Sequence, residues 1–163
     1  MKLYVMRHGI AEDAASSFHD FDRALTMKGR KRTREVARAL LHADEKPRLI
    51  IASPLVRALQ TAEIVSSVID PEEPVAVRQE IAPGGELMTL VNELLTAGCH
   101  PVMIVGHEPD LSMLVDQLLG GHAWERPFQK AMVVGLRLDP SGKNRIRFVL
   151  DPKNLQLKHT EGG

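Results

Sequence analysis

The chain has 163 residues, 44% of them hydrophobic and 26% charged, a composition typical of one globular domain. Its 21 Lys and Arg residues balance 21 Asp and Glu residues, so no basic excess favours a nucleic acid or an anionic membrane as partner. The single cysteine, Cys99, excludes an intrachain disulfide and a cysteine-rich metal site, and we expect a reducing, cytoplasmic setting. No apolar run approaches the roughly 20 residues that a membrane-spanning helix needs.

Hydrophobic periodicity predicts an alternation of strands and helices along most of the chain. The polar segment 9–25 shows no clear period, and a loop of that length is often functional. The predicted elements, in chain order, are a strand at 3–6, a helix over 27–42 capped by Thr26, a strand at 49–52, a helix over 55–69, a weak strand at 75–77, a helix over 86–97, a strand at 102–105, a helix over 110–119, and strands at 132–138 and 145–150.

This order predicts an α/β fold, a three-layer α/β/α sandwich built on a mainly parallel sheet. The last two strands are joined through Asp139-Pro140-Ser141-Gly142, a short turn that indicates an antiparallel C-terminal hairpin. We expect residues 1–163 to form a single catalytic domain, with a loosely ordered tail from Lys153 to Gly163.

Basic side chains follow three of the predicted strands at the points where those strands end. Arg7 and His8 directly follow the first strand. Arg57 lies at the start of the helix after the second strand, and His107 comes soon after the strand at 102–105. Because open α/β sheets bind ligands beyond the carboxyl ends of their strands, we expect these four residues to share one pocket.

Such a cluster suits phosphoryl transfer, in which catalysis is mostly positioning and positive charge. Arg7, Arg57 and His107 are expected to surround the equatorial phosphate oxygens, with each arginine offering a planar fork of donors. His8 is expected to attack in line as a neutral imidazole, since the arginines disfavour its protonated form. Gly9 would let the backbone approach the substrate closely.

Taken singly, these residues also have structural readings, as surface arginines or as histidines that shape a turn. Their joint position at strand ends favours the functional reading. His107-Glu108 does not begin a His-Glu-x-x-His zinc helix, because Leu111 stands where the second histidine is required, so we expect no metal site. Trp124 and Phe128 either border the pocket or cover the core.

Four segments carry a family resemblance that spans the chain in order. They resemble motifs of the histidine phosphatase superfamily, whose members include the phosphoglycerate mutases. The segments are Met6-Arg7-His8-Gly9, Arg23 to Gly29, Ser53 to Ala62, and Val105-Gly106-His107. The short length and the closing Pro152-Lys153-Asn154-Leu155 are similar to the bacterial protein-phosphohistidine phosphatases of the SixA type.

The resemblance implies a phosphatase without cofactor, with His8 as nucleophile and a covalent phosphohistidine intermediate. Arg7, Arg57 and His107 would complete a pocket in which phosphate or sulfate binds, and Arg23 would be a further phosphate-facing arginine. Many family members carry a carboxylate general acid on an insertion that is absent here. Glu80 is the nearest positional candidate, and its structural reading is a solvated glutamate that closes a strand.

The missing insertion favours phosphohistidine as substrate, because an imidazole leaves more readily than an alkoxide, which needs a proton. The first hypothesis is therefore a phosphatase that acts on phosphohistidine in a signalling or phosphotransfer protein. The second is a phosphatase of a small phosphometabolite or nucleotide, with Glu80 as acid. The third is a phosphate-binding module without turnover.

Overall fold

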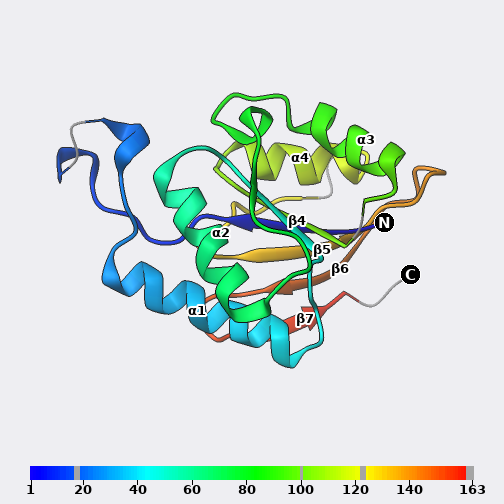
Figure 1. Cartoon of the computed structure of the whole chain (residues 1–163). Helices are drawn as coiled ribbons and strands as arrows, with labels where there is room; N and C mark the ends of the chain where they lie inside the picture. The colour runs from blue at the N-terminus through cyan, green and yellow to red at the C-terminus, as the bar shows by residue number, and fades with distance from the viewer. Residues whose placement is uncertain (17–18, 100, 122–123, 161–163) are drawn as a thin grey trace.

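The structure is a computed structural model that describes residues 1–16, 19–99, 101–121 and 124–160. Its helices and strands alternate as the sequence predicts (Figure 1). The elements are β1 (Lys2–Arg7), η1 (Ala14–Ser16), η2 (Asp20–Asp22), α1 (Met27–His42), β2 (Leu49–Ala52), α2 (Val56–Ile69), β3 (Ala76–Val77), η3 (Gln79–Ile81), α3 (Leu87–Ala97), β4 (Val102–Gly106), α4 (Asp110–Leu118), β5 (Val133–Arg137), β6 (Arg145–Leu150) and β7 (Leu157–His159), where η marks a short 3-10 helix.

The strands form one sheet in the order β3-β2-β4-β1-β5-β6-β7. Strands β1 to β4 pair in parallel, whereas β5, β6 and β7 are added antiparallel at one side. The predicted α/β fold, with a parallel central sheet and an antiparallel C-terminal hairpin, is confirmed.

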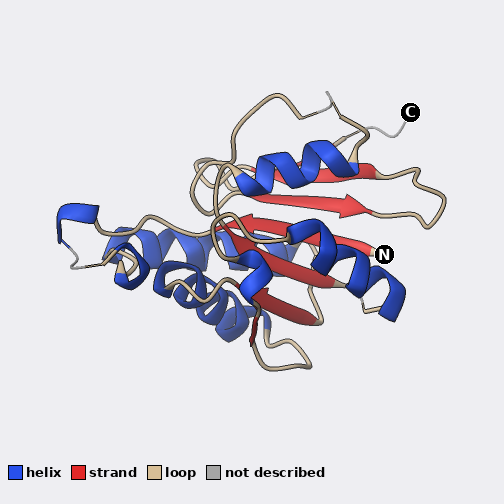
Figure 2. Ribbon diagram, turned by 90° about the horizontal axis from the view of Figure 1, so that it is seen from above, coloured by secondary structure: helices blue, strands red, loops and turns tan. Residues whose placement is uncertain are grey.

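Helices cover both faces of this sheet, so the molecule has the three expected layers (Figure 2). Helices α3 and α4 pack on one face, where Leu90 and Leu114 belong to a buried cluster with Val5. Helices α1 and α2 pack on the other face, where Val36 and Val65 join a second buried cluster. Burial of these apolar surfaces is the main force that holds the layers together.

Helix boundaries follow the local signals in the sequence closely. Helix α1 begins after Thr26, whose hydroxyl oxygen accepts a hydrogen bond of 2.9 Å from the backbone N–H of Gly29, as a cap should. Helix α3 ends at Gly98, which has a positive φ of 67°. In the described part of the chain, no helix combines the length and apolarity needed to cross a membrane.

The tail differs from its prediction. We expected Lys153–Gly163 to be loosely ordered, but Leu157–His159 forms β7 and pairs antiparallel with β6. Three residues give no clear period, so this pairing depends on a tertiary partner that local sequence does not reveal. Residues 161–163 of the tail, and residues 17–18 of the predicted loop 9–25, lie outside the described residues. The remainder of that loop contains η1 and η2.

The sheet register brings the ends of β1, β2 and β4 together at the edge away from the N-terminus (Figure 1). The backbone N–H of His8 donates to the carbonyl of Gly106 at 3.1 Å. The N–H of Ser53 donates to the carbonyl of Val105 at 3.0 Å. The residues that directly follow these three strands therefore face a common site.

Candidate active site

His8 is buried, and its two ring nitrogens have different partners. Its Nδ1 lies 2.7 Å from the carbonyl oxygen of Gly9. Because a carbonyl only accepts hydrogen bonds, Nδ1 carries the proton and Nε2 keeps its lone pair. The Nε–H of Arg57 points to this Nε2 at 3.4 Å. The unprotonated Nε2 therefore accepts from Arg57 and carries the lone pair that an imidazole nucleophile requires.

The electrostatic setting keeps His8 neutral. Burial is the largest cause that lowers its pKa, to about 3, and the nearby His107, Arg57 and Arg7 lower it further. The hydrogen bond to Gly9 acts in the opposite direction. A neutral imidazole at neutral pH agrees with the sequence-based expectation for an attacking group.

Gly9 fixes the backbone beside His8. Its N–H donates to the hydroxyl of Thr61 at 3.0 Å, and that hydroxyl donates to the carbonyl of Arg57 at 2.7 Å. A Cβ at Gly9 would lie 2.6 Å from Oγ1 of Thr33. The glycine is thus explained by close packing against α1, whereas the sequence analysis expected it to admit the substrate.

Two further pocket residues each have one paired and one unpaired nitrogen. Arg7 donates from Nη1 to the carbonyl of Phe128 at 2.7 Å, and Nε2 of His107 lies 2.7 Å from Oγ of Ser53. Among the described residues, Nε of Arg7 and Nδ1 of His107 are buried without a hydrogen-bond partner. Buried polar atoms are rarely left unpaired, so these two nitrogens remain available to a bound ligand.

The partner of His107 is compatible with a donor role for its other nitrogen. Oγ of Ser53 accepts from the N–H of Leu55 at 3.3 Å, and its own O–H can donate to Nε2 of His107. With that hydrogen bond, Nδ1 of His107 carries the proton and is a donor. Burial and the charge of Arg57 lower the pKa of His107 to about 4, so the ring is neutral at neutral pH.

Arg57 and Arg23 meet at a carboxylate that the sequence analysis did not single out. Arg57 donates to the backbone carbonyl of Asp20 at 2.9 Å and lies 3.3 Å from its carboxylate. Arg23 forms an ion pair with the same carboxylate at 2.9 Å. The structure thus joins Arg23 and Arg57 through one carboxylate, and a role of Arg23 in binding phosphate stays a prediction. Asp20 lay in an aperiodic polar segment, where only its spacing of three residues from Arg23 could have drawn notice.

Glu108 was also missed, although it is the residue after His107. Its carboxylate accepts from the N–H of Ser112 at 2.9 Å and from the N–H of Phe128 at 3.2 Å. Phe128 is 1% exposed and belongs to the core, and its carbonyl is the partner of Arg7. Glu108 therefore ties the start of α4 to the segment that orients Arg7. Burial lowers the pKa of Arg7, and the negative charge of Glu108 raises it, so Glu108 offsets part of the effect of burial.

Glu80 was the candidate general acid, and its contacts argue against that role. Its two carboxylate oxygens accept from Arg78, at 2.6 Å and 3.1 Å. These hydrogen bonds lower the pKa of Glu80, so the carboxylate stays ionised. An ionised carboxylate has no proton to give to a leaving group.

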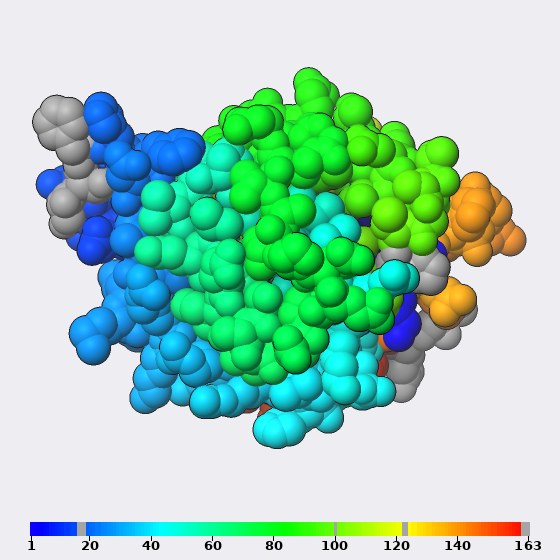
Figure 3. All heavy atoms as spheres, viewed as in Figure 1, coloured from blue at the N-terminus to red at the C-terminus, as the bar shows by residue number. Residues whose placement is uncertain are grey.

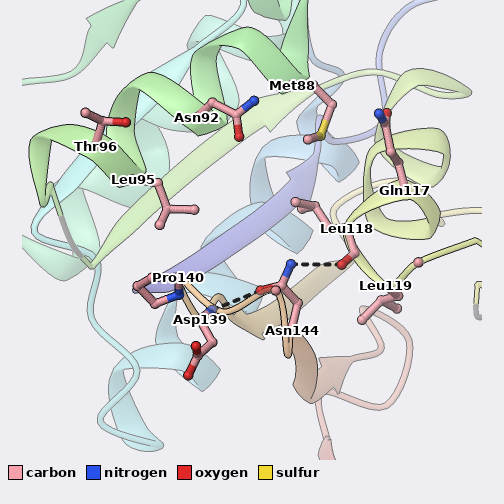
Figure 4. Close-up of a pocket in the computed structure, with 12 residues that line it drawn as sticks. Met88, Asn92, Leu95, Thr96, Gln117, Leu118, Leu119, Asp139, Pro140 and Asn144 are labelled. Atoms are coloured by element: carbon pink, nitrogen blue, oxygen red, sulfur yellow. Dashed lines mark hydrogen bonds between the residues drawn. The ribbon is translucent and has the colours of Figure 1, made fainter.

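A cavity of about 720 Å³ lies elsewhere. It is lined by one side of α3, by the end of α4 and by the β5–β6 connection (Figure 4). Asn144 closes one side, where it donates to the carbonyl of Leu118 and accepts from the N–H of Asp139. None of His8, Arg7, Arg57 and His107 lines this cavity. Chemistry, and not cavity size, identifies the candidate site.

Within residues 1–16, 19–99, 101–121 and 124–160, no cluster of three or more His, Cys, Asp or Glu side chains is placed to hold a metal ion. The guanidinium groups of Arg7 and Arg57 give the candidate pocket positive charge, which attracts anions, and the Asp20 carboxylate offsets part of it.

Comparisons with known proteins agree with this geometry. The sequence model of the histidine phosphatase superfamily (branch 1) matches residues 3–82. The chain is 38% identical over 155 residues to an uncharacterized protein of Picosynechococcus, covering 93% of this chain and 92% of that protein. It is 30% identical over 163 residues to the phosphohistidine phosphatase SixA of Escherichia coli, covering 96% of this chain and 98% of SixA.

Solved structures give the same result. The structure of the protein histidine phosphatase SixA complexed with tungstate matches with a TM-score of 0.87 and 27% identity, covering 96% of this chain and 100% of that one. A structure of the putative phosphohistidine phosphatase SixA from Agrobacterium tumefaciens has the same fold, with a TM-score of 0.79, 23% identity, and coverage of 93% and 97%. By fold and by sequence, the chain belongs to the histidine phosphatase superfamily and is similar to SixA.

Proposed function

We propose that this protein is a metal-independent phosphatase that removes phosphate from phosphohistidine in a signalling or phosphotransfer protein. The observation that carries the proposal is the bonding of His8, whose Nδ1 is held by Gly9 while Nε2 keeps its lone pair beside Arg57. The unpaired nitrogens of Arg7 and His107 complete an anion site around it. The family and the similarity to a phosphohistidine phosphatase support the substrate class.

In the first step, the Nε2 lone pair of His8 forms a bond to phosphorus. The bond from phosphorus to the substrate nitrogen breaks, and its electron pair stays on the leaving imidazole, which takes a proton from solvent. Arg7, Arg57 and His107 donate hydrogen bonds to the equatorial oxygens, where charge accumulates. The hydrogen bond from Nδ1 to Gly9 stabilises the positive charge that forms on the His8 ring.

In the second step, water attacks the phosphorus of phospho-His8. The bond between phosphorus and Nε2 breaks, inorganic phosphate leaves, and His8 returns to its neutral form. A substrate with an alkoxide leaving group needs a proton donor in the first step. Because Glu80 is ionised in its pair with Arg78, the small-ester alternative lacks the acid on which it depends.

The decisive experiment is dephosphorylation of a histidine-phosphorylated phosphotransfer domain in the presence of a chelator. We expect wild type to release phosphate, His8→Ala to lose activity by a factor of about 10³ or more, and phospho-His8 to be trapped in an alkaline quench. His42→Ala is the matched control, because it removes an exposed imidazole from the far end of α1.

Three other results would contradict the proposal. Equal activity of His8→Ala and wild type would exclude His8 as nucleophile. Turnover of small phosphate esters alone would favour the metabolite phosphatase. If the protein bound phosphate but turned over neither the phosphoprotein nor small esters, the hypothesis of a non-catalytic phosphate-binding module would remain.

A further inference from the structure

Helix α1 carries an unusual concentration of positive charge for a chain with no net charge. Between residues 28 and 38 there are six Lys and Arg residues and one acid, Glu35, although the whole chain has 21 residues of each sign. A charged helix face is usually solvated and mixed in sign. A single-sign face therefore calls for a physical explanation.

Four of these basic residues share one exposed side of the helix. The residues are Arg30, Lys31, Arg34 and Arg38, and we call this set the α1 basic face. Their spacings of three, four, seven and eight residues place them together on a helix. The opposite side of α1, with Thr33, Val36 and Leu40, is buried against the sheet.

In the part of the chain that the structure describes, the α1 basic face takes part in no ion pair. The ion pairs found there join other side chains. Arg30 and Arg34, like Arg34 and Arg38, are four residues apart, and like charges at that spacing destabilise a helix. The face therefore costs stability within the isolated chain, and it presents its positive charge to solvent.

The start of α1 packs directly against the catalytic segment. A Cβ on Gly9 would lie 3.3 Å from the carbonyl of Gly29, and one on Gly29 would lie 2.0 Å from the carbonyl of Ile10. From Gly29 to Arg38 the helix extends about 14 Å, at roughly 1.5 Å per residue. The α1 basic face thus leads away from the pocket over a distance that a protein surface spans and a small ester does not.

Two exposed apolar side chains belong to the segments that hold the pocket and begin α1. Phe21 is 48% exposed and follows Asp20, which contacts Arg57. Met27 is 89% exposed and is the first residue of α1. In the space-filling view, η2 (blue, upper left) and the start of α1 (lighter blue, lower left) lie along the same margin of the molecule (Figure 3). Aromatic and Met side chains beside basic residues are typical of protein–protein interfaces.

We infer that the α1 basic face, with Phe21 and Met27, is the docking surface for a phosphoprotein that carries acidic side chains around its phosphohistidine. This inference rests on the proposed function and adds the surface chemistry of its substrate. A protein partner explains the exposed apolar residues and the position beside the pocket, which a nucleic acid would not require. Complementary charge steers such a partner and orients its phosphohistidine toward His8.

The test compares two triple charge reversals. Arg30→Glu/Lys31→Glu/Arg34→Glu reverses the α1 basic face, and Arg137→Glu/Lys143→Glu/Arg145→Glu makes the same charge change at exposed positions on the opposite edge of the sheet. The substrate is a histidine-phosphorylated phosphotransfer domain of net negative charge. Binding of tungstate, measured by calorimetry, reports on the pocket itself.

At about 50 mM salt, we expect the α1 variant to raise KM for the phosphoprotein about 10-fold or more, with kcat within about 2-fold of wild type. Tungstate affinity should stay within about 2-fold, and the control variant should resemble wild type. Added salt should raise KM of wild type and leave KM of the α1 variant nearly unchanged, because screening removes the same attraction.

Equal KM values for the α1 variant and the control would overturn the inference while leaving the proposed function intact. A loss of DNA or RNA affinity in the α1 variant, without a change in KM, would assign the face to a nucleic acid and overturn the inference as well. Failure of wild type to dephosphorylate the domain would instead reject the proposed function, and the docking surface with it.

Discussion

The chemistry of the site depends on which nitrogen of each histidine is already occupied. In His8, the backbone carbonyl of Gly9 holds Nδ1 and leaves Nε2 to attack. In His107, Ser53 occupies Nε2 and leaves Nδ1 to donate. The two ring centroids lie 5.3 Å apart, and with the proton on Nδ1 in both rings, the proposed nucleophile uses Nε2 of His8 and the proposed donor uses Nδ1 of His107.

The acidic residue inside this basic pocket leads to a prediction. The Asp20 carboxylate shares Arg57 and Arg23, whose N–H groups a phosphate would also need. A partly exposed ion pair contributes about 0.2–1 kcal/mol, so we expect Asp20→Asn to bind inorganic phosphate about 1.5- to 5-fold more tightly. Competitive inhibition by phosphate measures this change. Asp22→Asn, in the same turn, is the control.

Weaker binding of phosphate to Asp20→Asn would contradict this prediction. It would mean that Asp20 holds the two arginines in their phosphate-binding orientation. The two explanations differ in sign, so one inhibition series separates them.

The side chains proposed to contact the anion were singled out from sequence, and the acidic residues that contact them or their neighbours were not. The strand ends of an α/β sheet are where ligands bind, and the side chains found there, Arg7, His8, Arg57 and His107, are types that bind phosphate. Fold and side-chain chemistry therefore indicate the same residues. Glu108 acts through the backbone of Phe128, 20 residues away, and Asp20 acts through Arg57, 37 residues away. Such contacts depend on loop conformation, which has no periodic signal.

At the scale of elements, the long segments with a repeating apolar pattern were predicted closely. The short segments that depend on contacts with the rest of the fold were not. Helix α1 spans Met27–His42 and strand β6 spans Arg145–Leu150, as the pattern predicted, because each presents a repeating apolar face. Strand β7 and the turns η1 and η2 are three residues long. Segments so short are too brief to show a repeating pattern and are fixed by the neighbours they pack against.

Packing between β5 and β6 gives a prediction at this scale. A Cβ on Gly135 would lie 2.3 Å from the ring of Phe148, which is fully buried and cannot swing away. We expect Gly135→Ala to lower the free energy of unfolding by about 1–3 kcal/mol. Urea unfolding measures the effect, and activity per folded molecule should not change.

The rescue variant for this prediction is Gly135→Ala/Phe148→Leu, which makes room for the added methyl group. In a double-mutant cycle, we expect the double variant to be more stable, by about 1 kcal/mol or more in its free energy of unfolding, than the sum of the two single changes predicts. Additive effects of the two changes would show that the ring does not limit this position.

For the whole molecule, the distribution of charge matters more than its sum. Because the net charge is zero, affinity for an anion has to come from a local cluster of basic groups. The pocket supplies that cluster from three strand ends, and α1 supplies a second one beside it. The composition of the chain could not predict where either basic cluster lies, because both positions depend on how the chain folds.

Stability of the whole molecule should reflect the burial of the catalytic histidines. The folded state lowers the pKa of His8 to about 3 and that of His107 to about 4, from 6.5. Below about pH 6.5 the unfolded chain therefore binds protons at these positions that the folded chain does not. The free energy of unfolding should fall by up to about 1.4 kcal/mol per pH unit for each histidine.

Urea unfolding at pH 7, 6 and 5 tests this expectation, because that window lies above the range in which carboxylates take up protons. The variant His8→Ala/His107→Ala should show a shallower loss of stability over the window than wild type. His42→Ala/His159→Ala, which removes two exposed imidazoles, should keep the slope of wild type. If the free energy of unfolding fell with the same slope in all three proteins, His8 and His107 would take up protons in the folded state without loss of stability. In that case His8 would not be a neutral nucleophile in mildly acidic solution.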